Sequence, residues 1–266
     1  MTTHKVNTAT PESHRPDFVS SLAKGLEVLA AFERGNMLGN QDLVARTGLP
    51  KTTVSRLTGT LAALGYLRLD DRSRKYTIGA RMLGIGASVQ RHMGLQQTAR
   101  PFMEALAQEL DITVILGARD RNGLVFLELV RPPRNMLTVN TDSGSVVPIE
   151  STSIGLAYLV TAPLIERVRV LESLRRHHPE DWDEVRKTIE RAHTDYSRQG
   201  FVVSQHSGKG TVSGVGVPLV LGSKGVFTFA CAGPSFELPL ARLTKVLGPR
   251  LADTVAKIRD AMTVPL

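Results

Sequence analysis

The sequence predicts a two-domain α+β protein, in which a small helix-turn-helix domain precedes a larger domain of mixed strands and helices. Three observations support this prediction. The chain has 266 residues, more than one domain of average size contains. Apolar residues recur at helical spacing in three short segments before residue 65, and a hairpin pattern follows them. After residue 100, strand-like runs are mixed with helical segments, which favours a largely antiparallel sheet flanked by helices.

The composition is that of a folded protein without a membrane span or a disulfide. Hydrophobic residues make up 42% of the chain and charged residues 22%. The longest stretch without a charge covers 15 residues, 151–165, and a membrane helix needs about 20. Residues 1–17 lack the apolar core of a signal peptide and predict a disordered tail. The single cysteine, Cys231, excludes an intramolecular disulfide, so a cytoplasmic location is expected.

Positive charge is concentrated in one part of the chain. The formal net charge is +8, and the segment from Arg46 to Tyr76 holds seven basic residues against two acidic ones. A compact basic surface favours a polyanionic partner, because neutralised phosphates release counterions. On charge alone, a solvated basic face without a partner is the favoured interpretation, so the sequence pattern must decide.

The first helical segment is expected after Ser20, a residue suited to a helix N-cap, and extends to about Arg34. Asn40 can cap a second, short helix that ends at Gly48, and a third helix from near Thr52 ends at Gly65. Two short helices joined by a tight glycine turn form a helix-turn-helix. The apolar stripes expected to be buried are Leu22, Leu26, Leu29, Ala30 and Phe32 in the first helix, Leu43 and Val44 in the second, and Val54, Leu57, Leu61 and Leu64 in the third.

A hairpin pattern follows the third helix. Tyr66 to Leu69 has the pattern of a strand, the polar run 70–74 that of a turn, and Lys75 to Ile78 that of a returning strand. A hairpin in this position is a wing. If the apolar stripe of the third helix faces the core, small and basic residues lie on its exposed side, near the helix N-terminus where major-groove readers contact bases. These residues are Lys51, Thr52, Ser55, Arg56 and Gly59.

The runs SLAKGLEVLAAF at 21–32, DLVARTGLPKTTVSRLTGTLAALGYLRLD at 42–70 and RKYTIGARMLGIG at 74–86 resemble the IclR family of bacterial transcription regulators. The resemblance covers nearly the whole chain and is closest in this part. It places Thr52, Thr53, Ser55 and Arg56 at recognition-helix positions. Family members often have His where this chain has Ser55, so the family's base preference there does not transfer. With Lys51, the expected DNA-binding residues are Lys51, Thr52, Thr53, Ser55 and Arg56 in the helix and Arg72, Arg74 and Lys75 in the wing.

The domain boundaries follow from these segments. The winged helix-turn-helix domain is expected over 18–80, a glycine-containing linker helix over 81–98, and an effector-binding and oligomerisation domain over 99–266. The resemblance implies that the linker helix contributes to dimer contacts and that the larger domain is a GAF-like or profilin-like sensor. In that domain the patterns predict strands at 112–116, 124–130, 136–140, 212–220 and 226–232, and helices from 100 and at 153–160, 163–174, 182–199 and 239–262.

The larger domain shows no catalytic or metal-binding motif. Neither GxSxG nor GxxxxGK[ST] occurs, and the adjacent residues His177 and His178 cannot share one helical face. Cys231 lies in an apolar strand pattern, where a buried, inert thiol is expected. We therefore expect no catalytic residue, no metal and no cofactor.

A binding site is expected where hydroxyl residues precede the helix at 153–160. Free N–H groups at that helix start can hold an anionic group, although capping of the helix by Ser151 or Ser153 is an equal alternative. The resemblance implies that this segment and two facing strands line the effector site. The residues expected there are Ser151, Thr152, Ser153, Ile154, Ser213 and Ala230. Relatives usually have acidic residues in the loop that here has 204–207 SQHS, which favours a small carboxylate as effector.

Together these predictions describe a ligand-responsive regulator that binds a near-palindromic operator in double-stranded DNA as a homodimer or a dimer of dimers. It is expected to control a catabolic operon in response to a small organic acid, as repressor or activator, and to have no membrane partner. Two alternatives are a small-molecule enzyme and an RNA-binding module, each with a basic N-terminal domain. Against the enzyme, the sequence of the larger domain shows no set of acid, base and nucleophile residues that would converge on a substrate. The RNA-binding module lacks aromatic residues for base stacking between Lys51 and Leu64.

Overall fold

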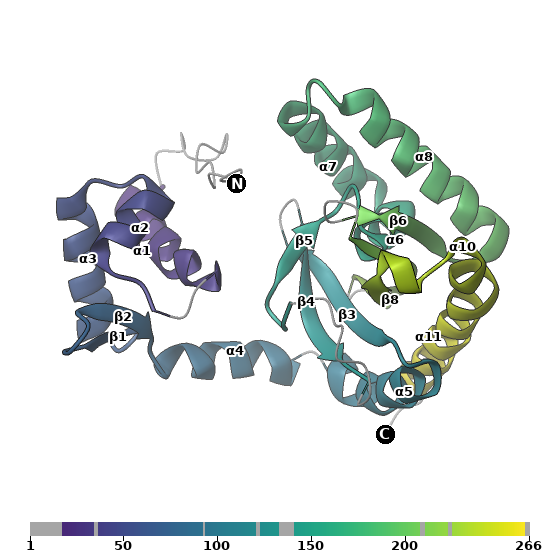
Figure 1. Cartoon of the computed structure of the whole chain (residues 1–266), viewed down its shortest axis with the longest axis horizontal. Helices are drawn as coiled ribbons and strands as arrows, with labels where there is room; N and C mark the ends of the chain where they lie inside the picture. Colours follow the sequence, from purple (N-terminus) through teal and green to yellow (C-terminus); the bar gives the residue numbers. More distant parts are fainter. Residues whose placement is uncertain are drawn as a thin grey trace. The chain divides into compact units, whose positions relative to one another are not determined.

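The computed structural model describes residues 18–34, 37–92, 94–120, 123–132, 141–207, 211–222 and 225–263. The chain divides into two compact units, Met1–His92 and Met93–Leu266, and each has its own core (Figure 1). Two predictions lie outside the described residues: the disordered tail at 1–17 and the strand at 136–140.

The described part of the first unit consists of short helices and a hairpin, in the order that the sequence predicts. Its elements are α1 (Ser20–Ala30), the 3-10 helix η2 (Ala31–Arg34), α2 (Asn40–Thr47), α3 (Lys51–Ala63), β1 (Leu67–Asp70), β2 (Lys75–Ile78) and α4 (Arg81–His92). The strands pair antiparallel, with Leu67 opposite Ile78 and Asp70 opposite Lys75. Leu38 adds a further antiparallel bridge to Tyr76. The predicted winged helix-turn-helix architecture is confirmed.

The buried face of α1 differs from the predicted one. Leu22 and Leu26 are 62% and 57% exposed, whereas Val28 lies in the core and Gly25 lies beside the Leu57 side chain of α3; Phe32, in η2, is buried as predicted. Apolar residues occur on more than one side of this helix, so only its packing against α3 decides which side is buried. The predicted cap is also shifted, since Val19 occupies the N-cap position and Ser20 is the first helical residue.

The single linker helix expected over 81–98 is two helices. The helix α4 ends at His92, and α5 (Leu95–Leu110) begins after Gly94, whose φ is +33°. The start of α5 belongs to the second unit, because Leu95 and Ala99 lie in its core. Gln96 anchors the same turn, where its Nε2 donates to the carbonyl oxygen of Leu127 at 2.6 Å.

The described part of the second unit forms a six-stranded antiparallel sheet with helices on both faces. The strands are β3 (Thr113–Asp120), β4 (Gly123–Val130), β5 (Val146–Pro148), β6 (Val202–His206), β7 (Val212–Val220) and β8 (Val226–Pro234), in the order β5-β4-β3-β8-β7-β6. The helices are α5, α6 (Ser153–Thr161), α7 (Leu164–His177), α8 (Trp182–Gln199), α10 (Leu240–Arg242), the π-helical segment η5 (Leu243–Leu247) and α11 (Gly248–Thr263). The predicted α+β class is confirmed.

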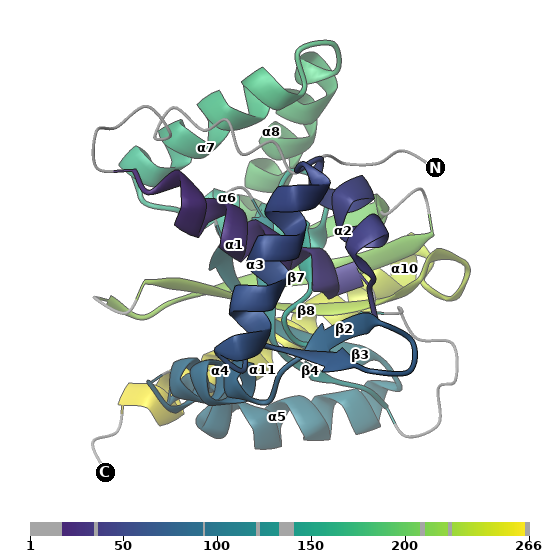
Figure 2. The ribbon, with the colours of Figure 1, turned by 90° about the vertical axis from the view of Figure 1, so that its left-hand side faces the viewer.

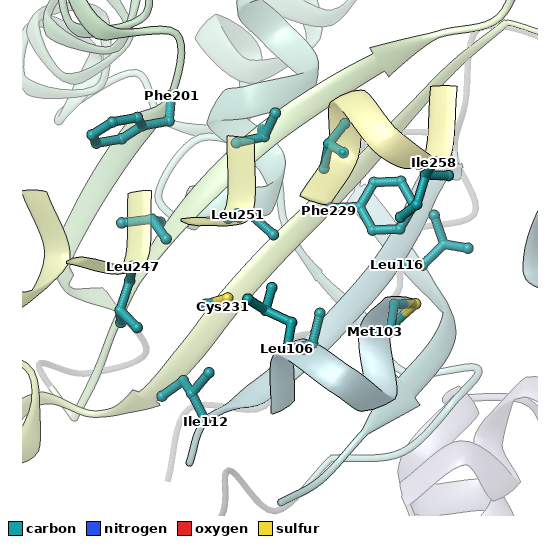
Figure 3. Packing of buried hydrophobic residues seen from close by; sticks show 14 of the residues in the cluster. Met103, Leu106, Ile112, Leu116, Phe201, Phe229, Cys231, Leu247, Leu251 and Ile258 are labelled. Atoms are coloured by element: carbon teal, nitrogen blue, oxygen red, sulfur yellow. The ribbon is translucent and has the colours of Figure 1, made fainter. Parts of the chain in front are cut away.

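The sheet separates two hydrophobic cores. One lies between the sheet and the helices α5 and α11, and Figure 3 shows Met103 and Leu106 packed with Phe229 and Leu251 in it. The other lies under α6, on the opposite face, and the hairpin of α7 and α8 covers it (Figure 2). Neighbouring residues of one strand alternate between the two cores, as a pleated sheet requires.

Two strands and one helix break were not predicted. The strand β5 has only three residues, and β6 includes residues 204–206, which we expected to lie in a loop. The expected helix at 239–262 is interrupted by η5, and Val246 in that segment is 42% exposed. None of the described helices is long and apolar enough to cross a membrane.

His193 on α8 makes the stability of the second unit depend on pH. Burial lowers the pKa of His193 below its usual value, and the positive charge of Arg167 on α7 lowers it further. The unfolded chain therefore takes up the proton at a higher pH than the folded chain does. Above the unfolded pKa, near 6.5, both states are neutral, and the free energy of unfolding is expected to fall as the pH drops below that value.

We expect His193→Gln to reduce the loss of stability that the protein undergoes as the pH falls. The measurement is the thermal midpoint from about pH 7.5 to pH 5.5, with His177→Gln, an exposed residue of the same hairpin, as the control. Equal acid sensitivity of His193→Gln and the wild type would contradict the assignment.

Candidate nucleic-acid interface and effector site

The turn between α2 and α3 has the geometry of a helix-turn-helix. Gly48 ends α2 with φ +71°, a left-handed conformation that glycine adopts without strain, and its N–H donates to the carbonyl oxygen of Val44. Pro50 then occupies the N-cap position of α3, where its missing N–H costs nothing. The Oγ1 of Thr58 on α3 donates to Asn40 Oδ1 at 3.2 Å, which joins the middle of α3 to the start of α2.

The exposed face of α3 is close to the predicted one. Lys51, Thr52, Ser55 and Arg56 are exposed and Thr53 is half-buried. Within the described residues, none of these five side chains has a hydrogen bond or an ion pair. Their donors and positive charges are therefore available to a partner. The predicted buried stripe is wrong at its end, because Leu64 is 50% exposed, and sequence reasoning missed the fully buried Thr58.

The wing brings the other predicted basic residues together. Arg72 and Arg74 lie in the turn between β1 and β2, Lys75 begins β2, and all three are exposed. Arg46, which contributes to the basic segment, has a structural role instead, since its Nη1 donates to the carbonyl oxygen of Ala31 at 2.7 Å. The first unit thus presents hydroxyl, amino and guanidinium groups on one exposed helix face and on one exposed hairpin.

The start of α6 is capped by Thr152, rather than by Ser151 or Ser153. The Oγ1 of Thr152 accepts from the Gly155 N–H at 3.2 Å and donates to the Pro148 carbonyl oxygen at 2.6 Å. Ser153 and Ile154 are buried. All four lie where the chain passes from β5 into α6, so the predicted segment is a compact helix start with the cap hydroxyl already occupied.

Close contact with the sheet explains the burial of Ser153. A Cβ atom on Gly216 of β7 would lie 2.1 Å from the Ser153 carbonyl oxygen, and one on Gly214 would lie 2.9 Å from Ser153 Oγ. Only glycine allows an approach this close. Ile154 packs over Gly117 of β3, and Ala230 of β8 belongs to the same core under α6.

Ser213 does not join this group. Along β7 it alternates with Gly214, which faces α6, and it shares a face with Val215, which lies in the core formed with α5 and α11. The side chain of Ser213 therefore points to the opposite face of the sheet, where its Oγ donates to Ser235 Oγ at 3.0 Å. The prediction that Ser213 and Ala230 line one site overlooked this change of face.

Two further residues at the start of α6 were missed. Ser204 of β6 is buried, and its Oγ donates to the Ser151 carbonyl oxygen at 2.6 Å. Glu150 lies next to Ser151, with its Oε1 3.4 Å from His178 Nε2. The Val-Val pair of 202–203 is the only sequence signal for the strand that positions Ser204. No local sequence pattern predicts the contact between Glu150 and His178 at the end of α7.

The described residues contain no group of three or more His, Cys, Asp or Glu side chains that could hold a metal ion. Cys231 is fully buried, and burial raises the pKa of its thiol to about 12, which keeps it protonated and unreactive at neutral pH.

Two family profiles match the chain. One, described as the IclR helix-turn-helix domain, covers residues 21–71, and the other, described as the bacterial transcriptional regulator IclR C-terminal domain, covers residues 87–221. The chain belongs to the IclR family. It is accordingly a transcriptional regulator with a helix-turn-helix DNA-binding domain and an effector-binding domain, and not an enzyme.

Relatives of known sequence and structure agree with this membership. The IclR-type protein "HTH-type transcriptional regulator TsaQ1/TsaQ2" of Comamonas testosteroni is 48% identical over 264 residues, 98% of this chain and 95% of its own. An IclR family regulator from Brucella abortus has 40% identity, a TM-score of 0.82 and coverage of 97% of both chains. The fold is also shared with an IclR homologue from Microbacterium hydrocarbonoxydans, solved in complex with 4-hydroxybenzoate. Its identity is 20%, its TM-score 0.68, and the match covers 91% of this chain and 99% of that one.

Proposed function

We propose that this IclR-family regulator acts in the cytoplasm as a homodimer or a dimer of dimers, binds a near-palindromic operator, and controls a catabolic operon in response to a small organic acid. The observation that carries the DNA-binding part is the exposed face of α3, where five predicted contact residues have no partner within the described residues. Symmetry supports the operator, since two copies of one recognition helix read two half-sites in opposite orientations.

In this proposal the two elements of the first unit have different tasks. Lys51, Thr52, Thr53, Ser55 and Arg56 enter the major groove, where Arg56 can pair with two acceptors of a guanine and the hydroxyl groups reach base edges or phosphates. The wing residues Arg72, Arg74 and Lys75 bind phosphates, which adds affinity without sequence preference. The helix α4 connects this unit to the effector-binding domain.

DNA binding is tested with the purified full chain and its own upstream intergenic DNA, against random DNA of equal length, over a salt series. We expect preferential binding of the upstream fragment and a steep loss of affinity as salt rises. If the operator lies elsewhere in the genome, a selection of bound fragments from genomic DNA will find it. Absence of any preferred fragment in that selection, with and without candidate acids, would refute the proposal.

For the effector, we propose a site at the start of α6, formed by Ser151, Thr152, Ser153, Ile154 and Ala230. Its polar groups are hydroxyls and main-chain N–H groups, which suit an anion at the positive end of a helix. The neutral residues Ser204 and Gln205 of β6 remove a repulsion that acidic residues would exert there. Glu150, the nearby carboxylate, has its Oε1 3.4 Å from His178. The Microbacterium homologue shows that this fold can hold an aromatic carboxylate.

Calorimetry with 4-hydroxybenzoate and the matched neutral 4-hydroxybenzamide tests the preference for a carboxylate. Hydrogen bonds to a charged group are worth about 1.5–3 kcal/mol, so we expect the acid to bind roughly 10- to 100-fold more tightly than the amide. Aliphatic acids of similar size extend the comparison. Thr152→Val keeps the side-chain shape but loses the hydroxyl. This variant is expected to bind the acid more weakly and to bind the amide as the wild type does. Binding of only neutral or cationic compounds would contradict the proposal.

A further inference from the structure

The turn of the wing is held together by one carboxylate. The Oδ2 atom of Asp70 accepts two hydrogen bonds from Ser73, from the main-chain N–H at 2.9 Å and from Oγ at 2.5 Å. The main-chain oxygen of Asp70 accepts a third from the N–H of Arg74 at 2.9 Å. These three bonds close the four-residue turn, 71–74, between β1 and β2.

The turn that they close is unfavourable for its own sequence. Arg74 has φ +55°, in the left-handed region where the Cβ atom of a non-glycine residue crowds the following carbonyl oxygen. Arg72 and Arg74 also place two guanidinium groups in one exposed turn beside Lys75. Strain and charge repulsion both favour opening of the turn, and the hydrogen bonds of Asp70 oppose it together with the pairing of β1 and β2.

The conformation of the turn does not bring Arg72 or Arg74 into a stabilising contact within the described residues. Both are exposed, and neither guanidinium group has a hydrogen bond or an ion pair there. A strained turn that displays two unpartnered cations is typical of a site whose conformation serves binding rather than stability.

We propose that Asp70 is a positioning residue for DNA binding, which acts through Ser73 to hold the wing turn so that Arg72 and Arg74 are ready to bind phosphates. This inference rests on the proposed function of the wing. The two bonds from Ser73 also lower the pKa of Asp70 below its usual value, so the carboxylate is ionised at neutral pH.

Two explanations of Asp70 make opposite predictions for DNA binding. As a negative charge near the phosphates, Asp70 opposes binding, and its removal should strengthen binding. As a positioning residue, Asp70 supports binding, and its removal should weaken binding. Asp70→Asn and Asp70→Ala remove the same charge, but the Asn variant keeps an oxygen that can accept both bonds from Ser73. The difference between these variants therefore isolates positioning from charge.

The experiment measures the affinity of the full chain for a random-sequence duplex of fixed length at several salt concentrations, so no operator is needed. We expect Asp70→Ala to weaken binding about three- to tenfold, the range of one or two net hydrogen bonds, and Asp70→Asn to bind at least as tightly as the wild type. Ser73→Ala, without a charge change, should weaken binding in the same direction. The matched control is Asp71→Ala, since the neighbouring Asp71 is exposed and its carboxylate makes no hydrogen bond within the described residues.

A double-mutant comparison separates positioning from loss of folding. In an Arg72→Ala/Arg74→Ala background the turn has no guanidinium group to position. Asp70→Ala should therefore have no further effect on the affinity for DNA. The affinity of the Asp70→Ala variant for DNA should also fall less steeply with rising salt concentration, as it does when phosphate contacts are lost. A variant that merely unfolds the wing would also lower the thermal midpoint of the first unit and would add its effect in that background.

The outcomes distinguish the inference from the function on which it rests. If Arg72→Ala/Arg74→Ala leaves affinity unchanged, the wing does not bind phosphates and the proposed function of the wing fails. If that pair weakens binding but Asp70→Ala binds as tightly as Asp70→Asn and Asp71→Ala, the wing binds DNA and the positioning role of Asp70 is refuted.

Discussion

Replacing Arg56 by alanine is expected to abolish most of the preference for the operator while leaving binding to random DNA nearly unchanged. Arg56 lies exposed near the start of α3, without a partner within the described residues. A bidentate pair with a base is worth about 1–3 kcal/mol, so operator affinity should fall roughly 10- to 100-fold. The measurement is the ratio of the two dissociation constants at one fixed salt concentration.

Two controls make this result specific. Lys75→Ala in the wing should weaken operator and random DNA equally and reduce the salt slope by about one. Arg175→Ala removes a positive charge from the exposed side of α7, in the other unit, and should change neither constant appreciably. Equal losses on operator and random DNA for Arg56→Ala would show that this side chain binds a phosphate instead of a base.

Placing an alanine at Gly216 is expected to be strongly destabilising, although a single methyl group is added. The new Cβ would lie 2.1 Å from the carbonyl oxygen of Ser153, and a main-chain atom cannot rotate away as a side chain can. The strand β7 and the start of α6 must therefore move apart. Overpacking typically costs about 1–3 kcal/mol, and we expect this main-chain clash to reach the upper end of that range. Trp182, the only tryptophan, packs against the core under α6, so urea unfolding followed by its fluorescence reports on this unit.

Gly233→Ala is the matched control on the neighbouring strand. Its Cβ would meet the side-chain ends of Ile112 and Leu238 at 3.1 and 3.4 Å, and these atoms can shift. We expect a change within about 1 kcal/mol. Similar stabilities of the two variants would show that the contact between β7 and α6 is looser than the structure has it. If the effector site is at the start of α6, Gly216→Ala should also lose carboxylate binding, and Gly233→Ala should keep it.

The sequence alone determined the DNA-binding unit in most of its detail. Its helices are short and end at glycines such as Gly48, whose left-handed conformation terminates a helix whatever packs around it. The hairpin is likewise local, since its turn residues and both strands lie within 66–78. The exposed face of α3 followed from helical periodicity, because the opposite face carries Val54 and Leu57.

Only the tertiary structure decided how the effector-binding unit assembles and which side chains meet in it. Ser213 and Ala230 are 17 positions apart in the chain, yet they face opposite sides of the sheet, because strand register and alternation decide direction. Ser204 meets Ser151 only because β6 pairs with the edge of β7, a contact across 53 residues that no local pattern encodes. Local interactions set the helix ends and the hairpin. The burial of one face over another, as with Leu22 and Val28 of α1, is a property of the packed chain.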